Sequence, residues 1–594
     1  MQPFLDVERS VTGRRWWNRG SCDREAERIA LTISQRHGLP DLAARVLASR
    51  GMTLENTERF LTPTLRSDLP DPMVLCDMQA GVDRLTRAVL AGETIGILAD
   101  YDVDGATSSA VLVRFLRAAG ANTLVHVPDR VTEGYGPNER ALAGLRERGA
   151  ALVVTLDCGT MAHDVLDASA DDGLDIIVVD HHMAEPELPR VTAVINPNRL
   201  DEDGTLGHLA AVGVTYLVVV ALNRSLRANG WYGERRPEPD LLALLDLVAL
   251  GTVCDVVPLH GLNRTFVTQG LKVMGRGHNA GLRALTRVAR LTRRPEASDL
   301  GYVLGPRINA AGRVGESGMG ARLLVLEDSD EAAAIAQVLE DRNTERRDIE
   351  KSVLEAACAQ VEHHGNNQTV IVVAGQDWHQ GVIGIVAGRL RERYQRPACV
   401  VSVDGGLAKG SGRSMPGFDL GTAIITARHH GILTAGGGHE MAAGFSLEAR
   451  QLNELRAFLA ARLAEQRDGA ALVPELAIDG VLAPAGARRE VIDALARLGP
   501  FGSGNPEPRF AITGARIVRA DVVGKRHVRC VLAGEDGARV QAIAFRALDT
   551  ELGPALLAHS GGSLHVAGHL RLDDWGGRSR IRVFIDDVAA NTGV

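Results

Sequence analysis

Short, continuous apolar runs separated by longer helical stretches dominate the first half of the chain. The four runs are TIGILA, ALVVTL, DIIVV and AVI. Runs of this kind are typical of strands buried on both faces, and the stretches between them are typical of crossover helices. The pattern predicts an α/β domain built on a parallel sheet, to which we assign residues 76–290.

Two other segments predict helices. Residues 1–75 contain short amphipathic helices and end in FLTPTLRSDLPDP, whose prolines and aspartates indicate a loop. Residues 329–364 contain no Gly or Pro and are rich in Ala, Glu and Arg, which predicts one long helix. We place this helix in a connector between two lobes, residues 291–365.

The remaining sequence predicts two further domains. A strand-helix unit, QTVIVVAG through GVIGIVAGRLRERY, indicates a smaller α/β domain over residues 366–465. Short strands at regular spacing over residues 466–594 indicate a C-terminal β-barrel. The expected fold class is therefore α/β, with a parallel-sheet domain, a long connector helix, a smaller α/β domain and a barrel.

Composition is that of a folded, multidomain protein. The 594 residues exceed what one hydrophobic core usually supports, so we expect three or four domains. No apolar run approaches the roughly 18 residues that span a bilayer, and the N-terminus lacks the apolar stretch of a signal peptide. The seven cysteines show no CxxC spacing, which favours reduced thiols in the cytoplasm over a zinc finger or a disulfide framework.

The formal net charge of −8 is unusual for a protein that binds nucleic acid, since basic surfaces normally neutralise phosphate. Metal-binding carboxylates would account for part of the negative charge, and a narrow channel can be basic on an acidic protein. Net charge alone therefore excludes no function.

Acids and histidines follow the predicted strands and the apolar stretch LLDLVALGTVC. Three acids alternate after TIGILA, so they point the same way while the chain is extended. Because the carboxyl ends of parallel strands converge on one crevice, we expect these side chains to meet there. The residues are Asp100, Asp102, Asp104, Asp157, Asp180, His181, His182 and Asp255.

Clustered carboxylates repel one another unless a cation lies between them, so the pattern indicates a metal site. Oxygen ligands with one or two imidazoles suit Mn²⁺ or Mg²⁺, and two such ions about 3.5–4 Å apart can promote phosphoester hydrolysis. A single acid could instead be a helix N-cap or a turn residue, as Asp104 before GATSSA could be. Recurrence at four strand or helix ends favours the metal site.

Four motifs, ADYDVDGATS, LDCGT, VDHH and LGTVCDVVPL, resemble the successive motifs of the DHH phosphoesterase superfamily. Further segments, from PDRVTEGYG to FGSGNPEPRF, resemble the RecJ exonucleases of that superfamily in order and spacing. The resemblance implies a DHH domain, a DHH-associated domain and an OB-fold. It also implies hydrolysis of single-stranded DNA from the 5′ end to 5′ mononucleotides, with two Mn²⁺ or Mg²⁺ ions, in DNA recombination and repair.

The resemblance gives the acids and histidines separate roles. The implied metal ligands are Asp102, Asp104, Asp157, His181 and Asp255, with Asp157 as the bridge between the ions. The implied catalytic residues, which orient ligands or the scissile phosphate, are Asp100, Asp157, Asp180 and His182. Cys158 and Ala99 stand where the family commonly has Asn and Gly, and Leu98 stands where some members carry a ligand histidine. These departures leave the metal preference open.

The resemblance also implies DNA contacts on both lobes and on the barrel, including a grip on the 5′ terminal phosphate. Taken alone, each of these arginines could be a surface salt-bridge residue, and each glycine run nearby could be a turn. The implied DNA-binding residues are Arg130, Arg307, Asn309, Arg313, Ser411, Arg413, His439, Lys525, Arg526 and Trp575.

Two other functions stay open. Relatives that hydrolyse short RNA or cyclic dinucleotides are compact two-domain proteins, whereas this chain predicts a C-terminal barrel. An inactive DHH scaffold would lack metal ligands, whereas every motif acid is present here. A single-strand-binding protein and a helicase are the partners that the resemblance suggests, and no membrane is expected.

Overall fold

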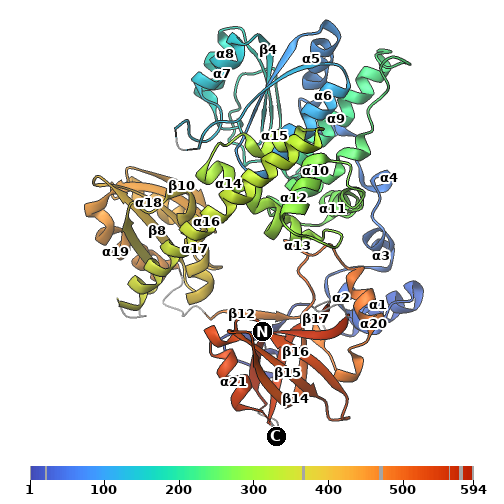
Figure 1. Ribbon diagram of the computed structural model, residues 1–594, viewed down its shortest axis with the longest axis vertical. Coiled ribbons are helices and arrows are strands. Elements are labelled where there is room, and N and C mark those ends of the chain that lie inside the picture. The colour runs from blue at the N-terminus through green and yellow to red at the C-terminus, as the bar shows by residue number, and fades with distance from the viewer. Residues whose placement is uncertain are drawn as a thin grey trace.

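The structure, a computed structural model, contains three lobes (Figure 1). We call them the first lobe (78–325), the second lobe (371–466) and the barrel (475–590). In the view of Figure 1 the first lobe lies at the top, the second at the left and the barrel at the bottom. The residues described are 2–20, 23–130, 132–363, 368–466, 473–560, 562–573 and 579–591.

A five-stranded parallel sheet forms the centre of the first lobe, with strand order β3-β2-β4-β5-β6. The four apolar runs form β2 (Thr94–Ala99), β4 (Ala150–Leu156), β5 (Asp175–Val179) and β6 (Ala193–Ile195), which confirms the predicted sheet. The sequence analysis missed the edge strand β3 (Asn122–His126) because its residues are only partly buried and form no continuous apolar run.

Helices cover both faces of this sheet. One face packs against α5 (Met78–Ala91), α6 (Val103–Ala118) and α9 (Ala211–Ala228) in the largest core of the molecule. The other face packs against α7 (Glu139–Glu147) and α8 (His163–Asp171). The sheet is therefore buried on both faces, as continuous apolar strands require.

Among the described helices, α9 is the one long and apolar enough to cross a bilayer by length and composition alone. The sequence analysis overlooked it because Asn223 and Arg224 interrupt its apolar run. Of this helix, 72% is buried inside the first lobe. This extent of burial is typical of a helix in a protein core.

A helical connector leads from the first lobe to the second. The predicted long helix is confirmed as α16 (Ser329–His363), which buries Leu339 in the core of the first lobe and Val353 in that of the second. A π-helical turn, Leu300–Leu304, leads directly into α14. The helices before α16 are α10 (Leu245–Cys254), α11 (Gly261–Met274), α12 (Ala280–Val288), α13 (Ala297–Asp299), α14 (Gly305–Val314) and α15 (Met319–Val325).

The second lobe is a smaller α/β unit, as predicted. Its sheet has the order β10-β11-β9-β8-β7, and only the β7–β8 pair is parallel. Its strands are β7 (Ile371–Gln376), β8 (Ala398–Asp404), β9 (Leu407–Arg413), β10 (Ala435–His439) and β11 (Ala442–Glu448). Its helices are α17 (Gln380–Tyr394), α18 (Leu420–His429) and α19 (Leu452–Gln466).

The C-terminal strands form the expected closed barrel, because β14 pairs with both β15 and β17. Its strands are β14 (Phe510–Val523), β15 (His527–Ala533), β16 (Arg539–Ala544), β17 (Ser563–Asp573) and β18 (Arg580–Ala590). The short elements around it are β13 (Gly480–Val481), α20 (Arg489–Ala496) and α21 (Leu552–Ala558). Closure removes the free sheet edges on which other chains could pair.

The N-terminal residues belong structurally to the barrel. β1 (Arg15–Asn18) pairs in parallel with β12 (Glu475–Ile478). Trp16 is fully buried, and its indole Nε1–H donates to Asp587 Oδ2 at 3.0 Å. The next helices, α1 (Arg24–His37) and α2 (Asp41–Ser49), share a hydrophobic core with the barrel strands, and α3 (Leu54–Leu61) and α4 (Leu65–Asp68) follow them. The domain boundaries given above stay a prediction.

Arg264 on α11 joins the barrel to the first lobe. Its guanidinium donates to the carbonyl oxygens of Phe60, Leu498 and Gly499 and stacks over the Phe60 ring at 3.6 Å. Burial lowers the pKa of Arg264 to about 10. A second link is the hydrogen bond from the Leu259 backbone to the Ser503 carbonyl at 2.8 Å.

Replacing Trp16 with Ala should destabilise the barrel by about 3–5 kcal/mol, because a buried ring is lost and Asp587 loses a hydrogen-bond donor. The neighbouring Trp17, which is only partly buried, provides the matched control Trp17→Ala. Urea denaturation should show the lower midpoint only for the Trp16 variant. Equal midpoints for the two variants would contradict the conclusion that the N-terminal strand is part of the barrel.

Candidate metal centre and nucleic-acid interface

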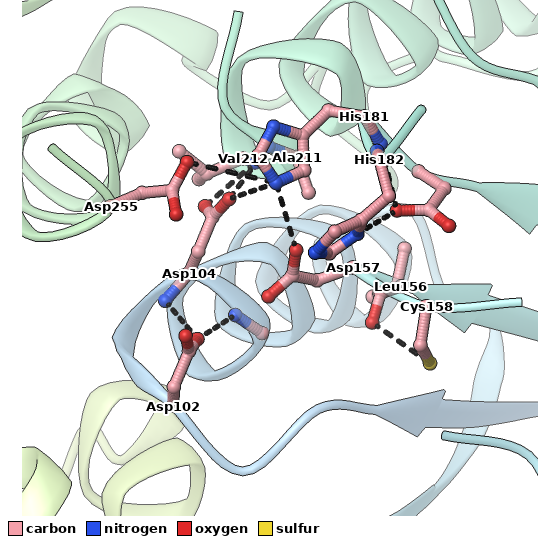
Figure 2. Close-up of polar contacts among 12 residues, drawn as sticks. Asp102, Asp104, Leu156, Asp157, Cys158, His181, His182, Ala211, Val212 and Asp255 are labelled. Carbon is pink, nitrogen blue, oxygen red and sulfur yellow. Dashed lines mark hydrogen bonds and ion pairs between the residues drawn. The ribbon is translucent and has the colours of Figure 1, made fainter. Parts of the chain in front are cut away.

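Three acids stand at one edge of the parallel sheet because each directly follows a strand, and Figure 2 shows one of them, Asp157, beside His181. The backbone of Asp100 donates to the Leu156 carbonyl at 3.2 Å, and that of Asp157 donates to the Val179 carbonyl at 3.0 Å. Asp180 continues the ladder on the next strand. Asp157 has a φ of +61°, a left-handed conformation that Asp tolerates better than most side chains do.

The start of α6 supplies two more carboxylates. Asp102 caps this helix by accepting from the backbone of Asp104 at 2.8 Å and of Gly105 at 3.1 Å. Asp104 is buried, and its two oxygens accept from the backbone N–H groups of Ala211 at 2.6 Å and Val212 at 2.9 Å, at the start of α9. Asp102, not Asp104, is therefore the N-cap of α6.

His181 faces three carboxylates with one ring nitrogen. Its Nδ1–H donates to the Leu209 carbonyl at 3.1 Å, which leaves Nε2 with a lone pair. That Nε2 lies 3.3 Å from Asp157 Oδ1, 3.6 Å from Asp255 Oδ2 and 3.9 Å from Asp104 Oδ2. Because Asp255 ends α10, the cluster draws its ligand atoms from two strand ends and two helices.

Asp180 and His182 form a separate pair beside this cluster. Asp180 Oδ1 lies 2.7 Å from His182 Nδ1, and Asp180 Oδ2 accepts from the Thr160 backbone at 3.1 Å. Burial alone would raise the pKa of Asp180, but the hydrogen bonds from His182 and Thr160 outweigh it and lower the pKa. Asp180 thus orients His182, whose side chain is 41% exposed toward the site.

The electrostatics of the cluster favour a bound cation. Burial, followed by the neighbouring carboxylates, raises the pKa of Asp100 to about 8, of Asp104 to about 7 and of Asp255 to about 9. The same two causes raise the pKa of Asp157 well above its usual value. Within this cluster, four buried side-chain atoms have no hydrogen-bond partner among the described residues, namely Asp100 Oδ1, Asp157 Oδ1, His181 Nε2 and Asp255 Oδ2.

These residues fit two divalent metal ions. Three groups hold ligand atoms within 4.8 Å of one another, namely Asp157-His181-His182, Asp104-His181-Asp255 and Asp100-Asp102-Asp157. Asp157 and His181 each belong to two of these groups, and of the two only Asp157 has a carboxylate, whose two oxygens suit the predicted role of bridge between the ions. A set of carboxylate oxygens with imidazole nitrogen suits Mn²⁺ or Mg²⁺.

Sequence reasoning missed several residues that shape the site. The Tyr135 hydroxyl donates to the Asp157 carbonyl at 3.2 Å, and its ring lies edge-on to His182. Asn196 and Asn198 donate to the backbone carbonyls of His182 and His181. The available signals were the tyrosine of PDRVTEGYG and the NPN that follows strand AVI.

The three departures from the family pattern add no ligand. Leu98 and Ala99 are fully buried in the sheet core. Cys158 is also buried, and its thiol donates to the Leu156 carbonyl at 3.4 Å. Burial raises the pKa of Cys158, so its sulfur stays protonated and is a poor metal ligand.

Three of the predicted arginines meet at the seam between the lobes. Arg130 lies over the Tyr101 ring at 5.2 Å, Arg313 donates to the Gly381 carbonyl at 2.8 Å, and Arg413 donates to Ser411 Oγ at 3.1 Å. Burial, together with the neighbouring arginines, lowers the pKa of Arg313 to about 10 and also lowers that of Arg413. None of the three forms a salt bridge with a described carboxylate, so this arginine cluster is suited to an anion.

The remaining predicted DNA contacts lie in different environments. Arg307 is buried and paired with Glu340 of α16, which favours a role in holding α14 to α16. Arg526 pairs with Asp549, and Lys525 lies exposed in the turn between β14 and β15. His439 is exposed at the end of β10, and Asn309 lines a groove beside α16. Trp575 lies outside the described residues.

Comparison with known proteins gives matches over most of the chain. Residues 94–252 match the DHH family N-terminal domain, residues 367–465 the DHHA1 domain, and residues 478–587 the RecJ OB domain. The single-stranded-DNA-specific exonuclease RecJ of Dickeya dadantii is 36% identical over 92% of this chain and 96% of its own length. The Escherichia coli protein of the same name is 35% identical over 93% of this chain and 96% of its own length.

The fold also matches solved structures. A crystal structure of RecJ from Thermus thermophilus in complex with Mn²⁺ superposes with a TM-score of 0.80 at 29% identity, covering 98% of this chain and 80% of that chain. The Mg²⁺ complex of the same protein gives a TM-score of 0.75 at 28% identity and covers 97% of this chain and 79% of that chain. The Thermus thermophilus protein thus binds both of the ions that the ligand set favours.

Replacing Asp157 with Asn should weaken Mn²⁺ binding, because the bridging position loses its charge while the side chain keeps its size. Saturating Mn²⁺ should raise the melting temperature of the wild type, since ligand at about 100 times its Kd adds about 2.7 kcal/mol of stability per site. The variant should show little of this rise in a fluorescence-monitored melt. Asp246→Asn, at a buried acid outside the cluster, should keep the full rise, and a full rise in the Asp157 variant would count against the site.

Proposed function

The chain belongs to the RecJ family of single-stranded-DNA-specific exonucleases, and on that premise we propose that it removes 5′ mononucleotides one after another from the 5′ end of single-stranded DNA. It is a metal-dependent phosphodiesterase that works with Mn²⁺ or Mg²⁺. A role in recombination and repair in the cytoplasm, beside a single-strand-binding protein and a helicase, is the biological expectation.

The observation that carries the proposal is the position of the arginine cluster next to the carboxylate cluster. Tyr101, which lies between Asp100 and Asp102, supports the Arg130 guanidinium on its ring. Gly312 packs so closely on Tyr101 that a Cβ there would lie 3.2 Å from the Tyr101 carbonyl oxygen. Arg130 therefore lies close enough to the metal ligands for its charge to act on Asp100, and on this proposal phosphates of the strand contact both clusters.

The chain's own residues would divide the work between the two clusters. Bound divalent ions would activate water and stabilise the oxygen that leaves in phosphodiester hydrolysis. Asp104, Asp157 and Asp255 would hold the ions, and His182, oriented by Asp180, would contact the scissile phosphate. Arg130, Arg313 and Arg413 would hold the 5′ terminal phosphate, and a fixed distance between the two phosphates would release one nucleotide at a time.

Location at a seam between lobes supports selectivity for single strands. Arg130 comes from the first lobe, Arg413 from β9 of the second, and Arg313 on α14 binds the start of α17. On this proposal, a terminal phosphate reaches the seam after its strand has separated from a partner strand. The overall charge of −8 does not oppose DNA binding here, because the anion site is locally positive.

An oligonucleotide labelled at one end tests the direction of cleavage. With Mn²⁺, the wild type should release labelled mononucleotide at once from a 5′-labelled single strand and only late from a 3′-labelled one. Asp157→Ala should release neither product, because the bridging ligand is missing. Early release of the 3′ label would overturn the proposed polarity.

Replacing Arg413 with Ala should reduce kcat/KM on a 5′-phosphorylated strand by about 10- to 100-fold, since a charge-assisted hydrogen bond is lost. The same variant should lose less activity on a strand with a 5′ hydroxyl, which lacks the terminal phosphate. Arg450→Ala removes an exposed arginine of the second lobe that pairs with Glu448, and it should behave as wild type on both substrates. An equal loss of kcat/KM on both substrates would show that Arg413 does not bind the terminal phosphate.

A further inference from the structure

A groove of about 900 Å³ continues from the arginine cluster toward the barrel. It runs between α14 and the facing sides of α16 and α17, and Arg526 and Arg546 of the barrel line it as well. Arg313 belongs both to this groove and to the arginine cluster. The groove is thus continuous with the proposed site of the terminal phosphate.

Cations dominate the lining of this groove, and several lack an acidic partner. Arg346 pairs with Glu350, and Arg393 pairs with Glu362. Four other basic side chains of the lining form no salt bridge with a carboxylate among the described residues. They are Arg313, Arg347, Lys351 and Arg546. A chain of phosphates could neutralise these charges along the length of the groove.

One aromatic side chain projects into this basic surface. Tyr302 is 83% exposed, more than any other large apolar side chain in the described part of the chain. It stands on the π-helical turn, between Leu300 and Leu304, which are both fully buried. The two leucines fix the turn in the core, so the ring of Tyr302 is held outward on a rigid base. Such single-turn π-helices are frequent at functional sites.

We propose that Tyr302 is a stacking platform for a base of the single strand, several nucleotides downstream of the 5′ end. An exposed aromatic ring within a basic groove is the combination with which proteins bind single strands without regard to sequence. The ring would stack on a base, while Arg347 and Lys351 would contact the flanking phosphates. The inference rests on the proposed function, because it assumes that the strand leaves the arginine cluster along the groove.

The alternative is that Tyr302 is an isolated exposed apolar residue, as surfaces often carry. The two readings differ in how activity depends on substrate length. A dinucleotide held by the arginine cluster ends before the platform, whereas a 20-nucleotide strand extends past it. Loss of the ring should therefore affect only the longer substrate.

The test compares Tyr302→Ala with Tyr302→Phe, which keeps the ring, and with Leu200→Ala, which removes an exposed apolar side chain outside the groove. With Mn²⁺, Tyr302→Ala should lose about 5- to 100-fold in kcat/KM on the 20-nucleotide strand and nothing on a 5′-phosphorylated dinucleotide. The other two variants should match the wild type on both substrates. Unchanged activity of Tyr302→Ala on the long strand, or an equal loss on the dinucleotide, would overturn the inference.

A binding measurement separates this inference from the proposed function. In the Asp157→Asn background, 2-aminopurine placed at successive positions of the strand should be quenched at one position by stacking. That quenching should vanish with Tyr302→Ala and persist with Tyr302→Phe, and its persistence with Tyr302→Ala would overturn the platform. If the wild type cleaves nothing, the proposed exonuclease fails, yet the quenching still decides the role of Tyr302.

Discussion

The repulsion among buried carboxylates at one edge of a parallel sheet is the constraint on which this structure depends. Asp104, Asp157 and Asp255 face a single imidazole nitrogen of His181 within 4 Å, and burial raises the pKa of each acid. A fold can keep such a cluster only if backbone hydrogen bonds hold the acids and a cation neutralises them. The N-terminus of α9 supplies those bonds to Asp104, and the continued strand ladder supplies them to Asp157.

The barrel is joined to the metal centre through the segment that directly follows the metal ligand Asp255. Asp255 ends α10, and the next helix, α11, carries Arg264, which donates hydrogen bonds to the carbonyl oxygens of Leu498 and Gly499 in the barrel. Between them, Leu259 binds Ser503 through its backbone. A metal ligand and the anchor of the barrel therefore lie within ten residues of sequence, so the distance between the metal centre and the barrel is fixed by buried structure and not by a loose linker.

The sequence was most informative where the physical signal is local. The apolar runs, the 35-residue helix α16 and the acids that follow the strands were predictable because burial and helix propensity act on neighbouring residues. The pairing of β1 with β12 was not, because it joins residues about 460 positions apart, and nothing in RWWN indicates its partner. The burial of Arg307 against Glu340 and the exposure of Tyr302 likewise follow from the packing of α14 on α16, which no single segment encodes.

An acidic protein can bind single-stranded DNA if its positive charges are concentrated where the phosphates bind. The catalytic carboxylates repel phosphate until divalent ions cover them, so binding at that end should depend on metal. The arginine cluster and the groove would attract phosphate without metal, because Arg313, Arg413 and Arg347 form no salt bridge with a carboxylate among the described residues. Base stacking on Tyr302 would add an attraction that salt screens weakly, whereas phosphate contacts weaken steeply with salt. A strand held by both kinds of contact would be held without regard to sequence, since neither contact depends on the identity of the base.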